Sequence, residues 1–159
     1  MSNQCTKIDM GGQGESRIQQ RTPPRTYPIL ADEVENPNDV VTSTFPVCSK
    51  TTHILFDTGA TRSFVSLSFV RYLSVPSQDL DICLAVETPS GNTLIADKVH
   101  RSCELMLCDR NMLVELVPLA ILNFDLTLGM DWLSANHASV DGFKKEVRFA
   151  ILDQPEFGF

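Results

Sequence analysis

The sequence is poor in the groups that proteins use to bind metals and nucleic acids. Its five cysteines, Cys5, Cys48, Cys83, Cys103 and Cys108, have no CxxC spacing, and its three histidines do not form the His-x3-5-His half of a zinc site. The 13 Lys and Arg residues are outnumbered by 20 Asp and Glu residues, for a formal net charge of −7, whereas a nucleic-acid-binding surface needs clustered cations to neutralise phosphates. We therefore expect reduced thiols, no metal or other cofactor, and no nucleic-acid partner.

Long apolar runs are also missing. The first residues, Met1 to Cys5, are polar, and the longest apolar stretch, residues 112–122, is interrupted by Glu115 and Pro118. These patterns predict neither a secretory signal nor a membrane-spanning segment. We expect an intracellular protein with no membrane partner.

What is present is the composition of an ordinary folded domain, with 43% hydrophobic and 21% charged residues. Residues 1–39 contain several Gly, Gln and Pro residues and no sustained apolar period, which is typical of a flexible linker. From Val40 onward, short apolar runs alternate with turn residues, which indicates an all-β domain. We therefore expect a linker or tail at 1–39, a folded domain at 40–152 and a C-terminal tail at 153–159.

The expected elements of this domain are short strands with one or two short helices. Helices are expected at residues 66–73 and 130–136, and the first of these has apolar residues at helical spacing. Alternation over residues 104–107 favours a strand with Cys103 in the core over a metal shared by Cys103 and Cys108. The expected strands are residues 40–48, 52–56, 82–88, 93–99, 101–107, 113–117, 124–128, 139–141 and 146–151, with the turn-rich tetrapeptide 89–92 at the tip of one hairpin.

Asp57 stands directly after an apolar strand and directly before Thr58-Gly59. Burying a carboxylate without partners is costly, so the site of Asp57 must supply hydrogen-bond donors. Gly59 allows a tight turn that brings its N–H toward the carboxylate, and Thr58 offers a hydroxyl to another loop. A plain turn is the simpler interpretation of the tripeptide alone. The apolar strand before it, the hairpin at residues 89–92 and the later Leu128-Gly129 favour a catalytic site instead.

A single carboxylate of this kind is a weak catalyst. Two carboxyl groups placed side by side share one proton, because like charges a few ångströms apart cannot both ionise. One carboxylate then takes a proton from an attacking water and the other donates to a peptide carbonyl, and the protons belong to the pair. The chain has one Asp-Thr-Gly; Asp125 and Asp131 are not followed by Thr/Ser-Gly, so a partner within the chain is disfavoured. A two-fold homodimer would bring two copies of Asp57 face to face.

Four segments follow one another along the folded region: VVTSTF at residues 40–45, ILFDTGATRSFVS at 54–66, FDLTLGMDWL at 124–133, and VD at 140–141. Together they resemble the retropepsin domain of gypsy-type LTR retrotransposon polyproteins, particularly those of plants. The resemblance covers roughly residues 40–151 and implies a small closed acid-protease barrel that carries a flap hairpin and works as a homodimer. The implied activity is that of an aspartic-type endopeptidase that processes its polyprotein in the cytoplasm or in virus-like particles.

The resemblance also assigns roles to residues in three places along the chain. A flap would close over the substrate and exclude water, while an apolar-Gly segment would pack beneath the catalytic loop. The implied partners are a second copy of the chain and a peptide or polyprotein substrate. The assigned residues are Asp57 as the catalytic aspartate; Thr58, Gly59 and Ala60 as its supporting loop; Pro89, Ser90 and Gly91 as the flap; and Leu128 and Gly129 as the segment beneath the loop.

Two alternatives remain open at this stage. The first is a catalytically silent transposon remnant or a host-retained domain for dimerisation or peptide binding. The intact Asp57-Thr58-Gly59 argues against decay at the site itself. The second is the related protease-like domain of ubiquitin-shuttle proteins, which is disfavoured because the sequence contains no ubiquitin-like segment.

Overall fold

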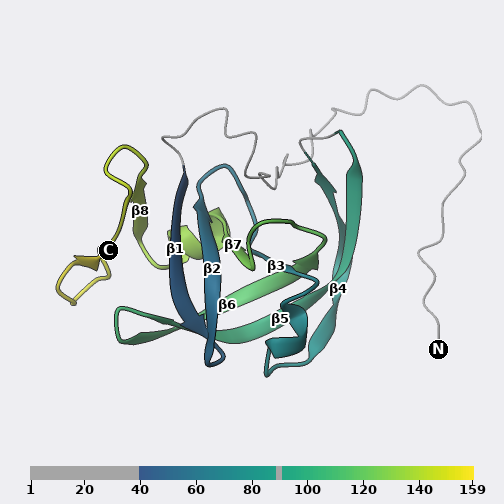
Figure 1. The fold of residues 1–159 in the computed structure, drawn as a ribbon, viewed down its shortest axis with the longest axis horizontal. Coiled ribbons are helices and arrows are strands. Elements are labelled where there is room, and N and C mark those ends of the chain that lie inside the picture. Colours follow the sequence, from purple (N-terminus) through teal and green to yellow (C-terminus); the bar gives the residue numbers. More distant parts are fainter. Residues whose placement is uncertain (1–39, 89–90) are drawn as a thin grey trace, which may run out of the picture.

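Strands make up most of the computed structural model of this protein, which describes residues 40–88 and 91–159 (Figure 1). The mostly β class predicted from the sequence is confirmed, and the described residues also contain one short α-helix and one 3-10 helix of three residues. The predicted linker at residues 1–39, as well as Pro89 and Ser90, lies outside the described residues. The elements are, in chain order, β1 (Val40–Val47), β2 (Lys50–Asp57), β3 (Phe64–Ser66), the 3-10 helix η1 (Val70–Tyr72), β4 (Ser77–Glu87), β5 (Thr93–Leu107), β6 (Arg110–Leu119), β7 (Leu126–Leu128), α1 (Met130–Ala135), β8 (Ala138–Asp141), β9 (Glu146–Phe149) and β10 (Phe157–Gly158).

Two hairpins close through two-residue loops in which both residues have positive φ. Cys48 and Ser49, with φ of 48° and 63°, join β1 to β2; Cys108 and Asp109, with φ of 48° and 60°, join β5 to β6. Positive φ at both positions is the geometry of a type I′ turn, whose twist matches the twist of the flanking strands. Because these loops are so short, β2 and β6 both start earlier in the chain than the sequence pattern predicted.

The main sheet contains seven strands in the order β1-β2-β7-β3-β6-β5-β4. The short β7 lies between β2 and β3; it runs parallel to β2, with Phe56 opposite Leu128, and antiparallel to β3. One further pair, Val47 with Leu105, joins β1 to β5, so the pairings of the six strands other than β4 close into a ring. β4 pairs with β5 alone, and the two strands form a long hairpin arm at one side of the domain (Figure 1).

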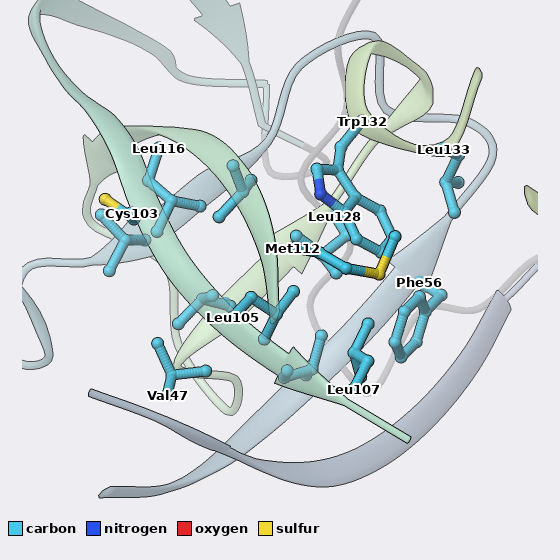
Figure 2. Packing of buried hydrophobic residues seen from close by; sticks show 14 of the residues in the cluster. Val47, Phe56, Cys103, Leu105, Leu107, Met112, Leu116, Leu128, Trp132 and Leu133 are labelled. Atoms are coloured by element: carbon cyan, nitrogen blue, oxygen red, sulfur yellow. The ribbon is translucent and has the colours of Figure 1, made fainter. Parts of the chain in front are cut away.

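Two buried apolar clusters hold these strands together. The larger one contains Phe56 of β2, Leu128 of β7 and Trp132 of α1, and Figure 2 shows them among side chains from β5 and β6. The smaller one contains Ala60 and Phe64 together with side chains of the β4–β5 hairpin. Full burial of a Leu or Phe side chain contributes about 1.5–3 kcal/mol. The larger cluster therefore fixes the end of β2, and the smaller one ties the hairpin to the segment that follows Asp57.

The two predicted helices have different outcomes. The helix predicted at residues 66–73 is reduced to the three residues of η1, because Ser66 belongs to β3 and its N–H donates to the carbonyl of Asp125 at 2.8 Å. The Ser66 hydroxyl then accepts the N–H of Phe69 at 3.2 Å, which makes a turn in place of a first helical turn. The helix predicted at residues 130–136 is confirmed as α1.

A second sheet, in the order β10-β9-β8, includes the C-terminal segment. The N–H and C=O of Phe159 bond to the C=O and N–H of Val147 at 3.1 and 3.0 Å. The Phe159 ring lies 4.6 Å from the ring of Phe45 and 5.3 Å from that of Phe56, measured between centroids. Part of the segment expected to be a tail, residues 153–159, thus packs on the domain, while the domain boundaries themselves stay a prediction.

The cysteines in the described part of the chain differ sharply in exposure. The predicted core position of Cys103 is confirmed: its side chain is 1% exposed, and burial raises its pKa from 9.0 to about 12. Because the thiolate is the reactive form, Cys103 is expected to react with iodoacetamide at pH 8 roughly 1,000-fold more slowly than an ordinary thiol. Mass spectrometry of the labelled peptides over time checks this, with the exposed Cys108 as internal control. Equal labelling rates at Cys103 and Cys108 would contradict the buried position.

Candidate active site

Asp57 is the last residue of β2, and its side chain is buried. The three residues before it are also buried, because β2 lies inside the main sheet between β1 and β7. The pairing of Phe56 with Leu128 holds the end of β2 against the end of β7. The prediction that an apolar strand delivers Asp57 at its end is confirmed, while the catalytic role of Asp57 stays a prediction.

The loop after Asp57 turns back toward the carboxylate. The N–H of Gly59 donates to Asp57 Oδ1 at 2.8 Å, and the N–H of Ala60 approaches the Asp57 carbonyl at 3.4 Å. A Cβ atom added to Gly59 would lie only 3.1 Å from Asp57 Oδ1, so a glycine suits this close approach. Thr58 is half-buried and Ala60 fully buried. The donor that the sequence predicted for the carboxylate is thus the Gly59 amide, in a charge-assisted hydrogen bond when Asp57 is ionised.

Gly129 lies beneath this loop, directly after β7. A Cβ atom there would stand 2.3 Å from the carbonyl oxygen of Arg62 and 2.7 Å from that of Ala60, both backbone atoms. The next residue, Met130, donates its N–H to the Ala60 carbonyl at 2.7 Å. Leu128 is fully buried in the larger apolar cluster. The structure therefore brings together Asp57, its supporting loop and the apolar-Gly segment that the family resemblance placed beneath that loop.

Two further residues join the loop to α1, and the sequence pattern did not single them out for this role. Ser63, at the end of the loop, donates its hydroxyl to Asp131 Oδ1 at 2.7 Å and its N–H to Asp131 Oδ2 at 3.1 Å. Ser63 Oγ in turn accepts the N–H of Gly129 at 3.1 Å. One available signal was the position of Asp131 in the first turn of a predicted helix, where an acidic side chain is favoured because it accepts free N–H groups.

Asp125, the other acidic residue considered as a partner for Asp57, lies at the opposite end of β7. Its carboxylate accepts the N–H of His53 at 2.9 Å, and its own N–H donates to the His53 carbonyl at 3.0 Å. His53 stands four residues before Asp57 on β2, which corresponds to roughly 13 Å along an extended strand. Asp125 thus serves to join β7 to β2.

The predicted flap corresponds to the tip of the β4–β5 hairpin. Pro89 and Ser90 lie outside the described residues, and Gly91 adopts φ of +81°, which L-residues rarely adopt. The Gly91 N–H donates to the Thr88 carbonyl at 2.9 Å, and the Asn92 N–H donates to Thr88 Oγ1 at 3.1 Å. The hairpin predicted around residues 89–92 is confirmed, and its strands are longer than expected.

One face of the hairpin packs toward the segment that follows Asp57. Val86 of β4 lies opposite Leu94 of β5, and Leu84 lies opposite Ala96. Val86 and Ala96 are buried in the smaller apolar cluster with Ala60 and residues of β3 and β6, and Leu84 and Leu94 pack against it. Movement of the hairpin relative to the domain would therefore change the packing around the loop that holds Asp57.

A carboxylate at a strand end, oriented by the amide of the loop that follows it, is a group that can take part in acid–base catalysis. Among residues 40–88 and 91–159, no three His, Cys, Asp or Glu side chains gather in a way that could hold a metal ion. In the same two ranges, no helix is long and apolar enough to cross a membrane.

Comparison with known proteins identifies a family and shows similarity to solved structures. The model of the family described as retroviral aspartyl protease matches residues 20–154 of this chain. The crystal structure of the retroviral protease-like domain of Ddi1 from Leishmania major is similar at 12% sequence identity and a TM-score of 0.49, over 74% of this chain and 90% of that chain. Among curated proteins, no sequence matches this chain significantly.

Proposed function

The chain belongs to the retroviral aspartyl protease family, and from this premise we propose that it is an aspartic endopeptidase active as a homodimer. Each protomer contributes one copy of Asp57, and the pair activates water for hydrolysis of a peptide bond. The observation that carries the proposal is the placement of Asp57 at the end of a buried strand, with its carboxylate held by the Gly59 amide. No second Asp-Thr-Gly occurs in the chain, so the second carboxylate comes from another copy.

In the proposed reaction, two neighbouring carboxyl groups hold one proton between them. The ionised group takes a proton from water as the water oxygen attacks the scissile carbonyl carbon, and the protonated group donates to the carbonyl oxygen. Collapse of the tetrahedral intermediate breaks the C–N bond: the leaving amine takes a proton from the pair, and one hydroxyl of the intermediate returns a proton to the pair as the carboxylic acid forms. The Gly59 amide supports this chemistry by fixing the direction of the Asp57 carboxylate.

As part of the same proposal, the substrate is an extended, largely apolar stretch of a polyprotein from a gypsy-type LTR retrotransposon. The sequence segments around Asp57 and Gly129, which resemble those of such polyproteins, support this origin. The enzyme then works inside the cell, in the cytoplasm or in virus-like particles, with a second copy of itself and its polypeptide substrate as partners.

A dilution series of the purified protein tests the shared active site. Specific activity on a peptide library at acid to neutral pH is expected to rise with protein concentration and to level off when the dimer is fully formed, because a monomer supplies only one carboxylate. Sedimentation under the same conditions should give the same midpoint. A statine-type transition-state mimic should block cleavage, since such compounds resemble the tetrahedral intermediate.

Two other outcomes of this experiment would each contradict part of the proposal. Constant specific activity from a protein that sediments as a monomer would exclude an active site shared between two chains. A stable dimer that cuts no peptide in the library would favour the silent, dimerising or peptide-binding domain instead.

A further inference from the structure

The loop that follows Asp57 passes around the end of β7. The chain leaves β2 at Asp57 and returns as β3 at Phe64, and β7 lies between these two strands in the sheet. Residues 58–63 therefore cross the point where β7 ends and α1 begins. Any bond between the loop and the start of α1 fixes the loop against the core, because Trp132 and Leu133 of α1 are buried there (Figure 2).

Ser63 makes four hydrogen bonds at this crossing while fully buried. Its N–H and hydroxyl both donate to the carboxylate of Asp131, and its hydroxyl oxygen accepts the Gly129 N–H. Its carbonyl accepts the N–H of Val117 from β6 at 3.0 Å. A buried polar residue with all of these groups paired has a single well-defined position.

Asp131 matches Ser63 because a carboxylate accepts hydrogen bonds at both oxygens. Oδ1 accepts the Ser63 hydroxyl and the Trp132 N–H, both at 2.7 Å, and Oδ2 accepts the Ser63 N–H. Asparagine in place of Asp131 would offer only one acceptor oxygen, so its amide NH2 would face either the donors on Oδ1 or the Ser63 N–H. The geometry thus requires the carboxylate and not merely a side chain of its shape.

We infer that Ser63 and Asp131 are a positioning pair for catalysis, fixing the loop that aims the Asp57 carboxylate. This inference rests on the proposed function. Hydrogen bonds hold the loop at two places. Ser63 donates to the Asp131 carboxylate, and the Ala60 carbonyl accepts the Met130 N–H. The Gly59 amide that holds Asp57 directly precedes Ala60, so loosening the loop changes where the carboxylate points. The β4–β5 hairpin, the proposed flap, packs against Ala60 and Phe64 in the smaller apolar cluster, whereas Ser63 and Asp131 bond to each other and to the start of α1, so substrate binding is affected less than turnover.

Asp131→Asn and Ser63→Ala are therefore expected to lower kcat by about 10- to 100-fold with KM changed less than about 3-fold, since misplacing a reacting group by an ångström has an effect of this size. Two matched variants control for loss of stability alone. Ser66→Ala makes the same change in β3, where the hydroxyl bonds to Phe69 N–H and faces Ser68. Asp141→Asn makes the same change at the end of β8, where the carboxylate accepts the backbone N–H groups of two residues in the turn that follows.

Amide hydrogen exchange in the same four variants tests the inference without relying on activity. The Gly59 and Ala60 amides should exchange at least about 10-fold faster in Asp131→Asn and Ser63→Ala than in the two controls, because local opening of the loop becomes easier. If the unchanged protein cleaves no peptide, the proposed function fails while the exchange rates still decide the positioning role. Equal exchange and equal kcat in all four variants would overturn the inference. Should Asp131→Asn not fold, Ser63→Ala decides, since it removes one oxygen atom only.

Discussion

Asp57→Asn is expected to reduce peptide cleavage by at least about 1,000-fold and to leave the protein folded. Asparagine has nearly the shape of aspartate and its oxygen still accepts the Gly59 N–H that bonds to Asp57 at 2.8 Å. What it loses is the ability to take up and release a proton, and general acid–base catalysis by a positioned group contributes about 10²–10⁴-fold. In a homodimer both copies are replaced at once, so neither base nor acid remains. Steady-state cleavage of a peptide substrate, with circular dichroism for the fold, measures both expectations.

Asp125→Asn is the matched control for this change. Asp125 is also an aspartate whose carboxylate accepts a backbone N–H, in this case that of His53, and it lies at the far end of β7 from Asp57. Its kcat and KM should stay within about twofold of the unchanged protein, because asparagine keeps the acceptor oxygen and surface polar changes of this kind have small effects. Equal turnover in Asp57→Asn and the unchanged protein would exclude Asp57 from catalysis.

Mixing experiments extend the same prediction to the shared active site. When a ninefold excess of Asp57→Asn is allowed to exchange subunits with the unchanged protein, roughly a tenth of the unchanged subunits remain paired with each other. Cleavage should fall to about that fraction, because a mixed dimer holds one carboxylate. If the mixture is as active as the same concentration of unchanged protein without the variant, each protomer works alone.

The local features of the site could be predicted from the sequence, because each depends on residues that are neighbours along the chain. The apolar run before Asp57 predicted its position at the end of a strand, and the strand is β2. The small and turn-forming residues at 89–92 predicted a hairpin there, and β4 and β5 provide it. Alternation of apolar and polar residues indicated that Cys103 is buried, and it is 1% exposed. Such patterns reflect the period of the backbone itself.

The remaining features depend on contacts between segments far apart in the sequence. Ser63 and Asp131 are 68 residues apart and meet only because β7 inserts between β2 and β3. The predicted helix at residues 66–73 gave way mostly to strand and turn for the same reason, since Ser66 bonds to the segment before β7. Similarly, nothing local to residues 153–159 indicates that Phe159 packs against Phe56, directly before Asp57. Periodicity predicts an element, but the pairing partner decides where it ends.

Gly129→Ala is expected to destabilise the protein by about 3 kcal/mol or more, although it adds a single methyl group. The backbone at Gly129 is extended, with φ of −97° and ψ of −173°, so alanine can adopt it without strain. The penalty is purely steric: the new Cβ would stand 2.3 Å from the Arg62 carbonyl oxygen and 2.7 Å from that of Ala60. Overpacking a core commonly costs about 1–3 kcal/mol and occasionally more, and here the atoms that must move are backbone.

Gly91→Ala separates this steric effect from a conformational one. Gly91 has φ of +81° and open space around the position of a Cβ, so alanine there suffers from its backbone conformation alone, about 1–2 kcal/mol. Urea denaturation of both variants gives the two free energies of unfolding. If Gly129→Ala is no less stable than Gly91→Ala, the loop does not rest on Gly129 as closely as the structure indicates. If Gly129→Ala is the less stable of the two, faster exchange of the Met130 amide should accompany it, because the Met130 N–H donates to the Ala60 carbonyl that the new methyl group displaces.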